Sequence, residues 1–517
     1  MVRRQRPSHG GYAAAVPAVT IFHVIPYLVL GSASLLVVVL PFGRDMLVPV
    51  FLMLCGALTP DIGINLPLSK ILFLIIFVKY GLYGRLAFGA VPGLSIYGVA
   101  IVVGLISAGI TLATETVRID YFGGELRNGW YRVAIVTINF VLSLLPFVLL
   151  SARGVPHSMS SLLRTYVVSA LVLCMIGIVQ YGVFRATGMD VIPLGLFTQS
   201  EADLRSGLGA TVGGEIDLRP GSFAGEPKSL GMFAATSIII LVAFGRLVVT
   251  TVWLRIALIF VALLTIFLTQ STSAFLSLPV GMAVYLALRA MGRPLPASAV
   301  FIIYTVVAFI LLAIFLERVA TAPEPSNDGV VSVVQNPTLG EFLYQRSIGR
   351  LDVEDFDWVI LKSFLADPAT VVLGRGFGLG HLTAGPFIPD VWRHYMEGRI
   401  IFPKTGVTYY FVNGGLVFVL IMMLYLARIT PTAGRGAVAN PDRSALVQQA
   451  QLALIPLVVL LLLRLYVYDV ALFVSAACLL GLSRHSTGRA DRGFVAGRIL
   501  HSRVEFLQNF GARRDQQ

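Results

Sequence analysis

The sequence predicts an all-α polytopic membrane protein with about 12 transmembrane helices and one large, partly helical loop on the outer side. Three observations carry this prediction. Of the 517 residues, 56% are hydrophobic and 13% are charged, whereas a soluble domain has roughly 45–50% apolar and about 25% charged residues. Apolar runs of transmembrane length recur along the chain. Two long polar stretches, 185–225 and 318–405, interrupt these runs.

The apolar runs are continuous rather than alternating, which excludes a porin-like barrel. One further run, 46–58, is too short for a full span, so we predict a half-span there. The predicted spans are 21–42, 68–84, 94–114, 131–151, 162–184, 226–247, 252–270, 272–290, 298–317, 406–428, 447–464 and 466–483.

Arginine marks the predicted cytoplasmic side. The loops 246–255, 289–297 and 428–446 and the tail 484–517 are rich in arginine, and short loops of this kind stay in the cytoplasm. Both termini are then cytoplasmic and both long polar stretches face outward. The predicted organisation is an N-terminal segment (1–20), N-terminal helices (21–184), an outer loop (185–225), central helices (226–317), a large periplasmic loop (318–405), C-terminal helices (406–483) and a basic tail (484–517).

The formal net charge of +12 follows from this topology. Both outer stretches contain more acidic than basic residues, so the basic excess lies elsewhere and we expect no nucleic-acid partner. Cys55, Cys174 and Cys478 lie scattered in apolar runs, where we expect buried small hydrophobic side chains. The chain has no CxxC, HExxH or Walker motif, and we predict neither a metal nor a cofactor.

The end of the first outer stretch is a candidate diphosphate site. The segment Arg219-Pro-Gly-Ser-Phe-Ala-Gly-Glu-Pro-Lys228 leads directly into a span. A helix start presents free backbone N–H groups, and together with Arg219, Lys228 and the nearby Arg205 it can bind an anion. The alternative is a capped helix start with basic residues at the membrane interface.

The second outer stretch contains a second candidate. Arg350 precedes the motif Gly374-Arg375-Gly-Phe-Gly378, in which glycines permit close approach to a ligand and the two arginines can bind phosphate. His381, His394 and Glu397 are alternative general bases, although a histidine in a surface loop is inert more often than not.

Other polar residues in these regions have simpler interpretations. Residues 350–365 have the apolar spacing of an amphipathic helix that lies on the membrane or over a cavity, and its acids, Asp357 among them, are expected on a solvated face. Lys79 is expected to pair or to reach out from a helix end. Arg464 either pairs with Asp469 or faces the outer cavity.

Four motifs together resemble the O-antigen polymerase and O-antigen ligase superfamily, whose members are membrane glycosyltransferases. The resemblance covers roughly 210–425. The motifs are, in chain order, Arg219, Gly221, Phe223 and Pro227; Thr269, Ser271, Ala274, Leu276 and Leu278; Arg350, Trp358, Pro368, Gly374, Gly376 and Gly378; and Asn413-Gly-Gly-Leu-Val-Phe.

The resemblance implies a GT-C-like architecture in the bacterial inner membrane and a metal-independent, inverting reaction on the outer side. The implied partners are a polyprenyl-diphosphate-linked glycan donor, a saccharide acceptor, membrane lipids and a chain-length regulator. Many members have Ser-Arg where Thr272 and Ser273 stand here, and His-Asn near the position of Lys404. His381 and His394 therefore compete for the role of the family's loop histidine, and Lys404 is a candidate for part of it.

Three functions remain open from the sequence. We favour a polymerase that extends a lipid-linked polysaccharide. A ligase or a protein O-oligosaccharyltransferase would use the same donor with another acceptor. A flippase or secondary transporter is less consistent with the chain, because transporters often consist of paired halves and the two halves here do not resemble each other.

Overall fold

The computed structural model describes residues 16–60, 66–88, 91–114, 129–152, 155, 158–192, 208–210, 216–321, 355–367, 370–380, 387, 403, 405–432 and 441–464. These residues form helices apart from one short hairpin. The elements are α1 (Val16–Val39), α2 (Leu47–Leu52), η1 (Gly56–Leu58), α3 (Leu68–Leu82), α4 (Leu94–Thr114), α5 (Gly129–Leu142), α6 (Leu145–Leu150), α7 (Met159–Thr187), β1 (Leu208–Ala210), β2 (Ile216–Leu218), η6 (Ser222–Ala224), α8 (Pro227–Val248), α9 (Val252–Thr269), α10 (Thr272–Met291), α11 (Ala297–Thr321), α13 (Asp355–Ala366), α14 (Thr370–Leu373), α17 (Gly406–Ile429) and α19 (Pro441–Arg464).

The protein is a polytopic helical membrane protein, as predicted. Among the described residues, eight helices are long and apolar enough to cross a membrane, and Val24–Val39 and Val447–Leu463 are shorter apolar helices. Each predicted span coincides with a helix or a broken helix, except 466–483, which lies outside the described residues. The total of about 12 spans therefore stays a prediction.

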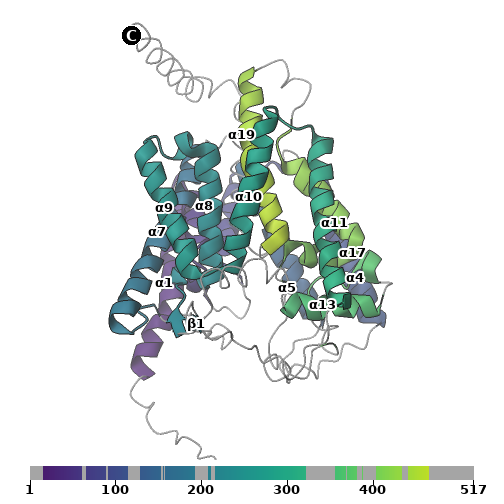
Figure 1. The fold of residues 1–517 in the computed structure, drawn as a ribbon, viewed down its shortest axis with the longest axis horizontal. Helices are drawn as coiled ribbons and strands as arrows, with labels where there is room; N and C mark the ends of the chain where they lie inside the picture. The colour runs from purple at the N-terminus through teal and green to yellow at the C-terminus, as the bar shows by residue number, and fades with distance from the viewer. Residues whose placement is uncertain are drawn as a thin grey trace, which may run out of the picture.

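The bundle has two distinct ends (Figure 1). The end where α8 and α10 begin is called the lower end here, and the end where they finish is the upper end. The arginine-containing connections after α8 and after α10 lie together at the upper end, while the β1–β2 hairpin and α13 lie at the lower end. In the hairpin Leu208 pairs with Leu218 and Ala210 with Ile216, antiparallel. The chain thus separates its basic loops from its long polar stretches, although which end faces the cytoplasm stays a prediction.

The N-terminal part differs from the predicted half-span. The run 46–58 forms α2 and the 3-10 turn η1, which are both far shorter than a span. However, α1 begins at the lower end (Figure 1), and η1 contacts η6 at that same end. The run 46–58 therefore carries the chain from the upper end of α1 back to the lower end of the bundle. Residues 1–15 lie outside the described residues.

Lys79 holds this return in place. Its ammonium group donates to the carbonyl oxygens of Val37 at 2.9 Å and Leu40 at 2.6 Å, at the end of α1, and pairs with the Asp45 carboxylate at 3.0 Å. The Tyr80 hydroxyl also donates to Asp45, at 2.9 Å. A charge in an apolar bundle needs such pairing, and of the two alternatives for Lys79 the structure shows the paired one.

Part of the second outer stretch, Gly374–Gly378, is inserted into the bundle. α17 is interrupted at Gly414 and Gly415, which have non-helical backbone angles. Gly374 lies against this break, and Gly376 lies against Ala108 of α4. Phe377, between Gly376 and Gly378, is fully buried. The centroid of its ring lies 5.3 Å from that of Phe140 and 5.8 Å from that of Phe418. Small residues permit such close packing of backbones inside a membrane protein.

We expect Gly376→Ala to destabilise the protein strongly. Gly376 has φ +90°, and a Cβ there would collide with the Ala108 backbone. The left-handed conformation costs an alanine about 1–2 kcal/mol and overpacking adds roughly 1–3 kcal/mol. The measurement is the midpoint of thermal unfolding in detergent. Gly292→Ala is the control, because Gly292 has φ +66° with open space around it, so equal shifts for the two variants would contradict the packing account.

Candidate functional site

One candidate site is the segment 219–226 at the lower end, called the arginine loop here. It leads from β2 through η6 into α8. The Arg219 guanidinium donates from Nε to the Thr269 carbonyl oxygen at 3.0 Å and from Nη2 to the Gln270 carbonyl oxygen at 3.3 Å. The last carbonyl groups of a helix lack partners within the helix, and here an arginine satisfies those of α9. The side chain is half-buried, so its position is fixed at the rim of the bundle.

A buried glutamine holds the middle of the arginine loop. The Ser222 N–H donates to Oε1 of Gln180 at 3.0 Å, and Ser222 is fully buried with φ +50°. Gln180 lies on α7 and is 2% exposed. Its Nε2 donates to the Asp190 carboxylate at 2.8 Å. The sequence analysis did not single out Gln180 or Asp190. A glutamine within the apolar span 162–184 was the signal that could have identified the first, since polar groups inside membranes usually have a specific role.

Glycines bring the arginine loop close to its neighbours. Gly56 lies against the Ala224 carbonyl group, and Gly177 of α7 lies against Pro220. Gly231, in the first turns of α8, lies against Ser271, whose hydroxyl group caps α10 by accepting from the Ala274 N–H. The first and second resemblance motifs therefore meet here in space.

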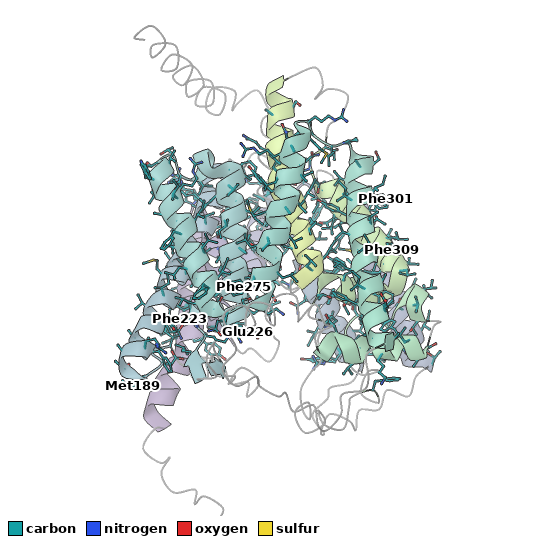
Figure 2. All side chains as sticks on the ribbon, viewed as in Figure 1. Met189, Phe223, Glu226, Phe275, Phe301 and Phe309 are labelled. Carbon is teal, nitrogen blue, oxygen red and sulfur yellow. The ribbon has the colours of Figure 1, made fainter. Side chains whose placement is uncertain are left out.

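The start of α8 is the second component of this site. Pro227 occupies the first turn, and the side chain of Glu226 makes no cap. The first N–H groups of a helix carry a partial positive charge. Lys228 is half-buried in that turn, and Glu226 is exposed at the lower end (Figure 2). Arg219, Lys228 and the α8 start thus form a positively polarised edge, and Glu226 adds one carboxylate beside it.

The glycine motif near Arg375 is packed against neighbouring helices, and a ligand contact there stays a prediction. Its glycines pack against α4, α5 and α17. Arg375 is 4% exposed. Its backbone N–H donates to the Val412 carbonyl oxygen at 2.8 Å, and its guanidinium contacts the Ser363 carbonyl oxygen at 3.4 Å and the Asp367 carboxylate at 3.6 Å. Burial lowers the pKa of Arg375 because the charged form loses water. These contacts favour an internal role for Arg375.

α13 confirms part of the predicted amphipathic helix. Val359, Ile360 and Phe364 are fully buried, and α13 packs on α11 and α17, so the helix covers the bundle. Asp357, expected on a solvated face, is 1% exposed and is therefore a correction. Asp357 lies about one helical turn before Ile360 and Leu361, which are both buried. The inward face of α13 is therefore wider than the apolar spacing indicates.

The third and fourth resemblance motifs also meet in space, because Gly374 lies against Gly414. This pair lies near α13, apart from the arginine loop near β1 along the lower end (Figure 1). Six predicted site residues fall outside the described residues, and the side chain of Arg464 does too. The six are Arg205, Arg350, His381, His394, Glu397 and Lys404.

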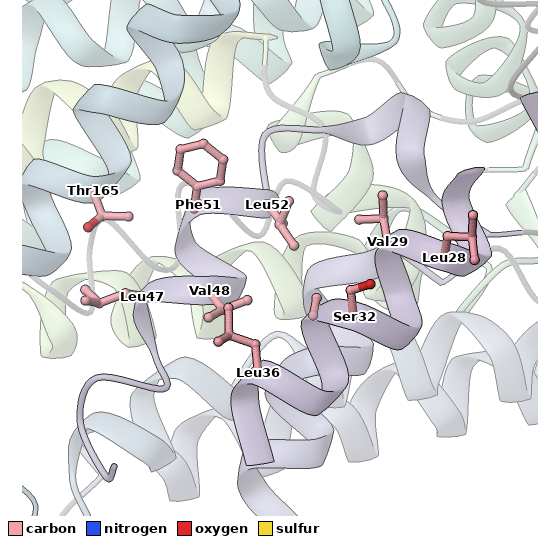
Figure 3. A pocket seen from close by; sticks show the side chains of 10 residues that line it. Leu28, Val29, Ser32, Leu36, Leu47, Val48, Phe51, Leu52 and Thr165 are labelled. Atoms are coloured by element: carbon pink, nitrogen blue, oxygen red, sulfur yellow. The ribbon is translucent and has the colours of Figure 1, made fainter. Parts of the chain in front are cut away.

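An apolar groove of about 580 Å³ lies between α1, α2 and α7 (Figure 3). Leu28 and Leu36 of α1, Leu47 and Phe51 of α2, and Thr165 of α7 are among the residues that line it. Such a surface suits hydrocarbon chains rather than polar ligands. Cys55 and Cys174 are both buried, as expected. In the described part of the chain, no three His, Cys, Asp or Glu side chains form a group that fits a metal ion.

Comparison with known proteins adds no assignment: no protein-family model and no curated protein sequence matches this chain.

We expect Arg375→Ala to reduce stability by about 2–3 kcal/mol, because it removes a buried charge-assisted contact and leaves its partners unpaired. The amount of folded protein and the thermal midpoint in detergent are the measurements. Asp367→Asn is the control. Its carboxylate is 46% exposed, and a pair of this kind contributes under about 1 kcal/mol. A fully stable Arg375→Ala variant would restore Arg375 as a candidate ligand-binding residue.

Proposed function

We propose that the protein is a membrane glycosyltransferase that polymerises polyprenyl-diphosphate-linked oligosaccharide units at the outer face of the inner membrane. The observation that carries the proposal is the arginine loop. It joins a fixed guanidinium to the start of α8 at the end of the bundle that also bears the polar stretches. Both are groups that bind phosphate oxygens. The resemblance of the four motifs supplies the reaction class.

In the proposed reaction, an acceptor hydroxyl oxygen attacks the anomeric carbon of the donor glycan. The new glycosidic C–O bond forms as the bond from the anomeric carbon to the diphosphate oxygen breaks. The bonding electrons leave with polyprenyl diphosphate, and the hydroxyl proton passes to a general base. His394, His381 and Glu397 remain the candidates for that base, and they lie outside the described residues.

The arginine loop supports the departure of the diphosphate electrostatically. Negative charge grows on the leaving oxygen during the reaction, and preorganised donors stabilise it without further reorganisation. The Arg219 guanidinium is oriented by two carbonyl groups from the end of α9. Lys228 stands in the first turn of α8. Arg350, Arg205 and Lys404, which lie outside the described residues, are proposed to contribute as well. The same is proposed for Arg464, whose side chain lies outside the description.

The apolar groove is the proposed binding surface for the lipid part of the donor. α2 forms one wall of the groove, and the chain continues from α2 directly into η1, which packs against η6 of the arginine loop. A hydrocarbon chain on this wall would thus lead toward the proposed diphosphate site. The groove is almost entirely apolar in its lining residues, which matches an isoprenoid chain.

Deletion of the gene distinguishes the proposal from its alternatives. For a polymerase we expect surface polysaccharide with a single repeat unit on a gel. A ligase or protein oligosaccharyltransferase would instead leave free polymer that is not attached to its acceptor. A flippase would leave no surface glycan and would accumulate lipid-linked units inside. The ligase pattern or the flippase pattern would contradict polymerisation, and the flippase pattern would contradict glycosyl transfer altogether.

Arg219→Ala is expected to reduce polymer formation by about 10²-fold or more, since it removes a donor from the leaving diphosphate. Arg219→Lys is expected to restore only part of the activity, because a lysine lacks the planar fork. The measurement is polymer per membrane-inserted protein in the deletion strain.

Arg164→Ala is the matched control for this variant. The Arg164 guanidinium donates its Nε to the Val248 carbonyl oxygen at 3.1 Å, so it also satisfies a carbonyl group at the end of a helix, but at the upper end. We expect nearly normal polymer from Arg164→Ala. Normal polymer from Arg219→Ala would overturn the diphosphate assignment.

A further inference from the structure

We propose that Gln180 is a positioning residue that fixes the arginine loop for the reaction and closes the first outer stretch at its base. This inference rests on the proposed function. In sequence, Gln180 is far from Arg219 and Lys228, the two basic residues of the candidate site, and none of the resemblance motifs includes it. Its role follows from three hydrogen bonds that it makes to both ends of the stretch 185–225.

The geometry of the Gln180 amide is determined by its partners. Oε1 accepts from the Ser222 N–H at 3.0 Å, and Nε2 donates to Oδ1 of Asp190 at 2.8 Å and to the Ile192 carbonyl oxygen at 3.5 Å. Reversing the amide would place its N–H₂ group against the Ser222 N–H and its oxygen against the carboxylate. Only one orientation is therefore compatible with these neighbours. The side chain is 2% exposed, so water does not replace these bonds.

The two ends of the outer stretch converge on this one side chain. α7 ends at Gly188 with a left-handed cap, and Asp190 then accepts from both Gln180 and the Ile192 N–H, the latter at 3.0 Å. The chain returns through β2 to Ser222. Gln180 thus joins the start of the stretch, at Asp190 and Ile192, to its end, at Ser222. A rigid base of this kind restricts where the arginine loop can lie relative to α7.

Ser222 is a strained position of the arginine loop that one hydrogen bond to Gln180 restrains. A non-glycine residue with φ +50° is strained unless its surroundings hold it. The bond from its N–H to Gln180 is one such restraint, and the contact of Pro220 with Gly177 is another. Arg219 precedes Ser222 by three residues, and α8 begins five residues after it. Relaxation at Ser222 would therefore move the guanidinium relative to the helix start, and catalytic geometry tolerates little displacement.

Gln451 provides a matched control at the upper end of the bundle. It is also 2% exposed. Its Oε1 accepts from the Leu295 N–H at 2.7 Å, and its Nε2 donates to the carbonyl oxygens of Leu295 at 2.9 Å and Pro431 at 2.8 Å. Gln180→Met and Gln451→Met each remove three hydrogen bonds of one buried glutamine and keep a side chain of similar length. Their effects on the thermal midpoint should be similar.

The test is release of polyprenyl diphosphate from a lipid-linked oligosaccharide by full-length protein in membrane vesicles, at several donor concentrations. We expect Gln180→Met to lower kcat/KM about 10- to 100-fold, mainly through kcat, and Gln451→Met to change it less than about twofold. Equal activity losses in the two variants would mean that Gln180 acts only through stability, which would overturn the inference. An unchanged Gln180→Met would overturn it as well.

Asp190 supplies a second pair of variants that keeps the inference testable if Gln180→Met does not fold. Asp190→Asn retains the acceptor oxygen for Gln180 and Ile192 and should remain close to wild type, whereas Asp190→Leu should lose activity like Gln180→Met. An Asp190→Asn variant as inactive as Asp190→Leu would indicate a direct role of the carboxylate charge and would overturn positioning. Failure of the proposed function itself has a separate signature, which is that the wild-type protein releases no polyprenyl diphosphate from the donor.

Discussion

The fold depends on one constraint, which is that polar backbone can enter an apolar helical bundle only where it finds partners at short range. The break of α17 at Gly414 and Gly415 and the segment Gly374–Gly378 satisfy this constraint together. The Arg375 N–H donates to the Val412 carbonyl oxygen, two residues before the break, and the Ser107 hydroxyl donates to the Leu373 carbonyl oxygen. In a membrane such groups have no water to bind. Glycine is required here because any side chain would separate the two backbones.

The arginine loop follows the same rule at another place along the lower end. Its backbone leaves regular structure, and contacts from three neighbouring helices stabilise it. The Gln180 side chain of α7 binds Ser222, the Gly56 backbone of η1 lies against Ala224, and carbonyl groups at the end of α9 bind Arg219. Arg219 therefore has a structural task as well as its proposed chemical one. The two tasks are compatible, because a guanidinium has five donors and the helix end fixes its plane. This explains why a structural control such as Arg164 is needed beside any Arg219 variant.

Sequence reasoning was accurate for helices and less accurate for the role of each polar residue. The spans followed from apolar length alone, and α4 was placed at 94–114 without error. The short run 46–58 was correctly excluded as a full helix but incorrectly treated as a half-span, because apolar length does not reveal how far a broken segment travels. The sequence predicts Arg375 as a phosphate-binding residue and Asp357 on a solvated face, because both are charged and lie in a polar stretch. In fact both are buried, since the stretch folds back onto α11 and α17.

By itself, the sequence determined that the chain is a helical membrane protein, where most of its described helices lie, and that the arginine-containing loops after α8 and after α10 share one end. These properties depend on local composition, because the transfer of apolar residues into a bilayer is nearly additive along a helix. The tertiary structure alone decided which motifs meet: Arg219 with the Thr269–Ser271 turn, Gly374 with Gly414, and Gln180 with both ends of the first outer stretch. Those contacts join residues up to tens of positions apart, and their selection depends on shape and hydrogen-bond geometry that no local pattern encodes.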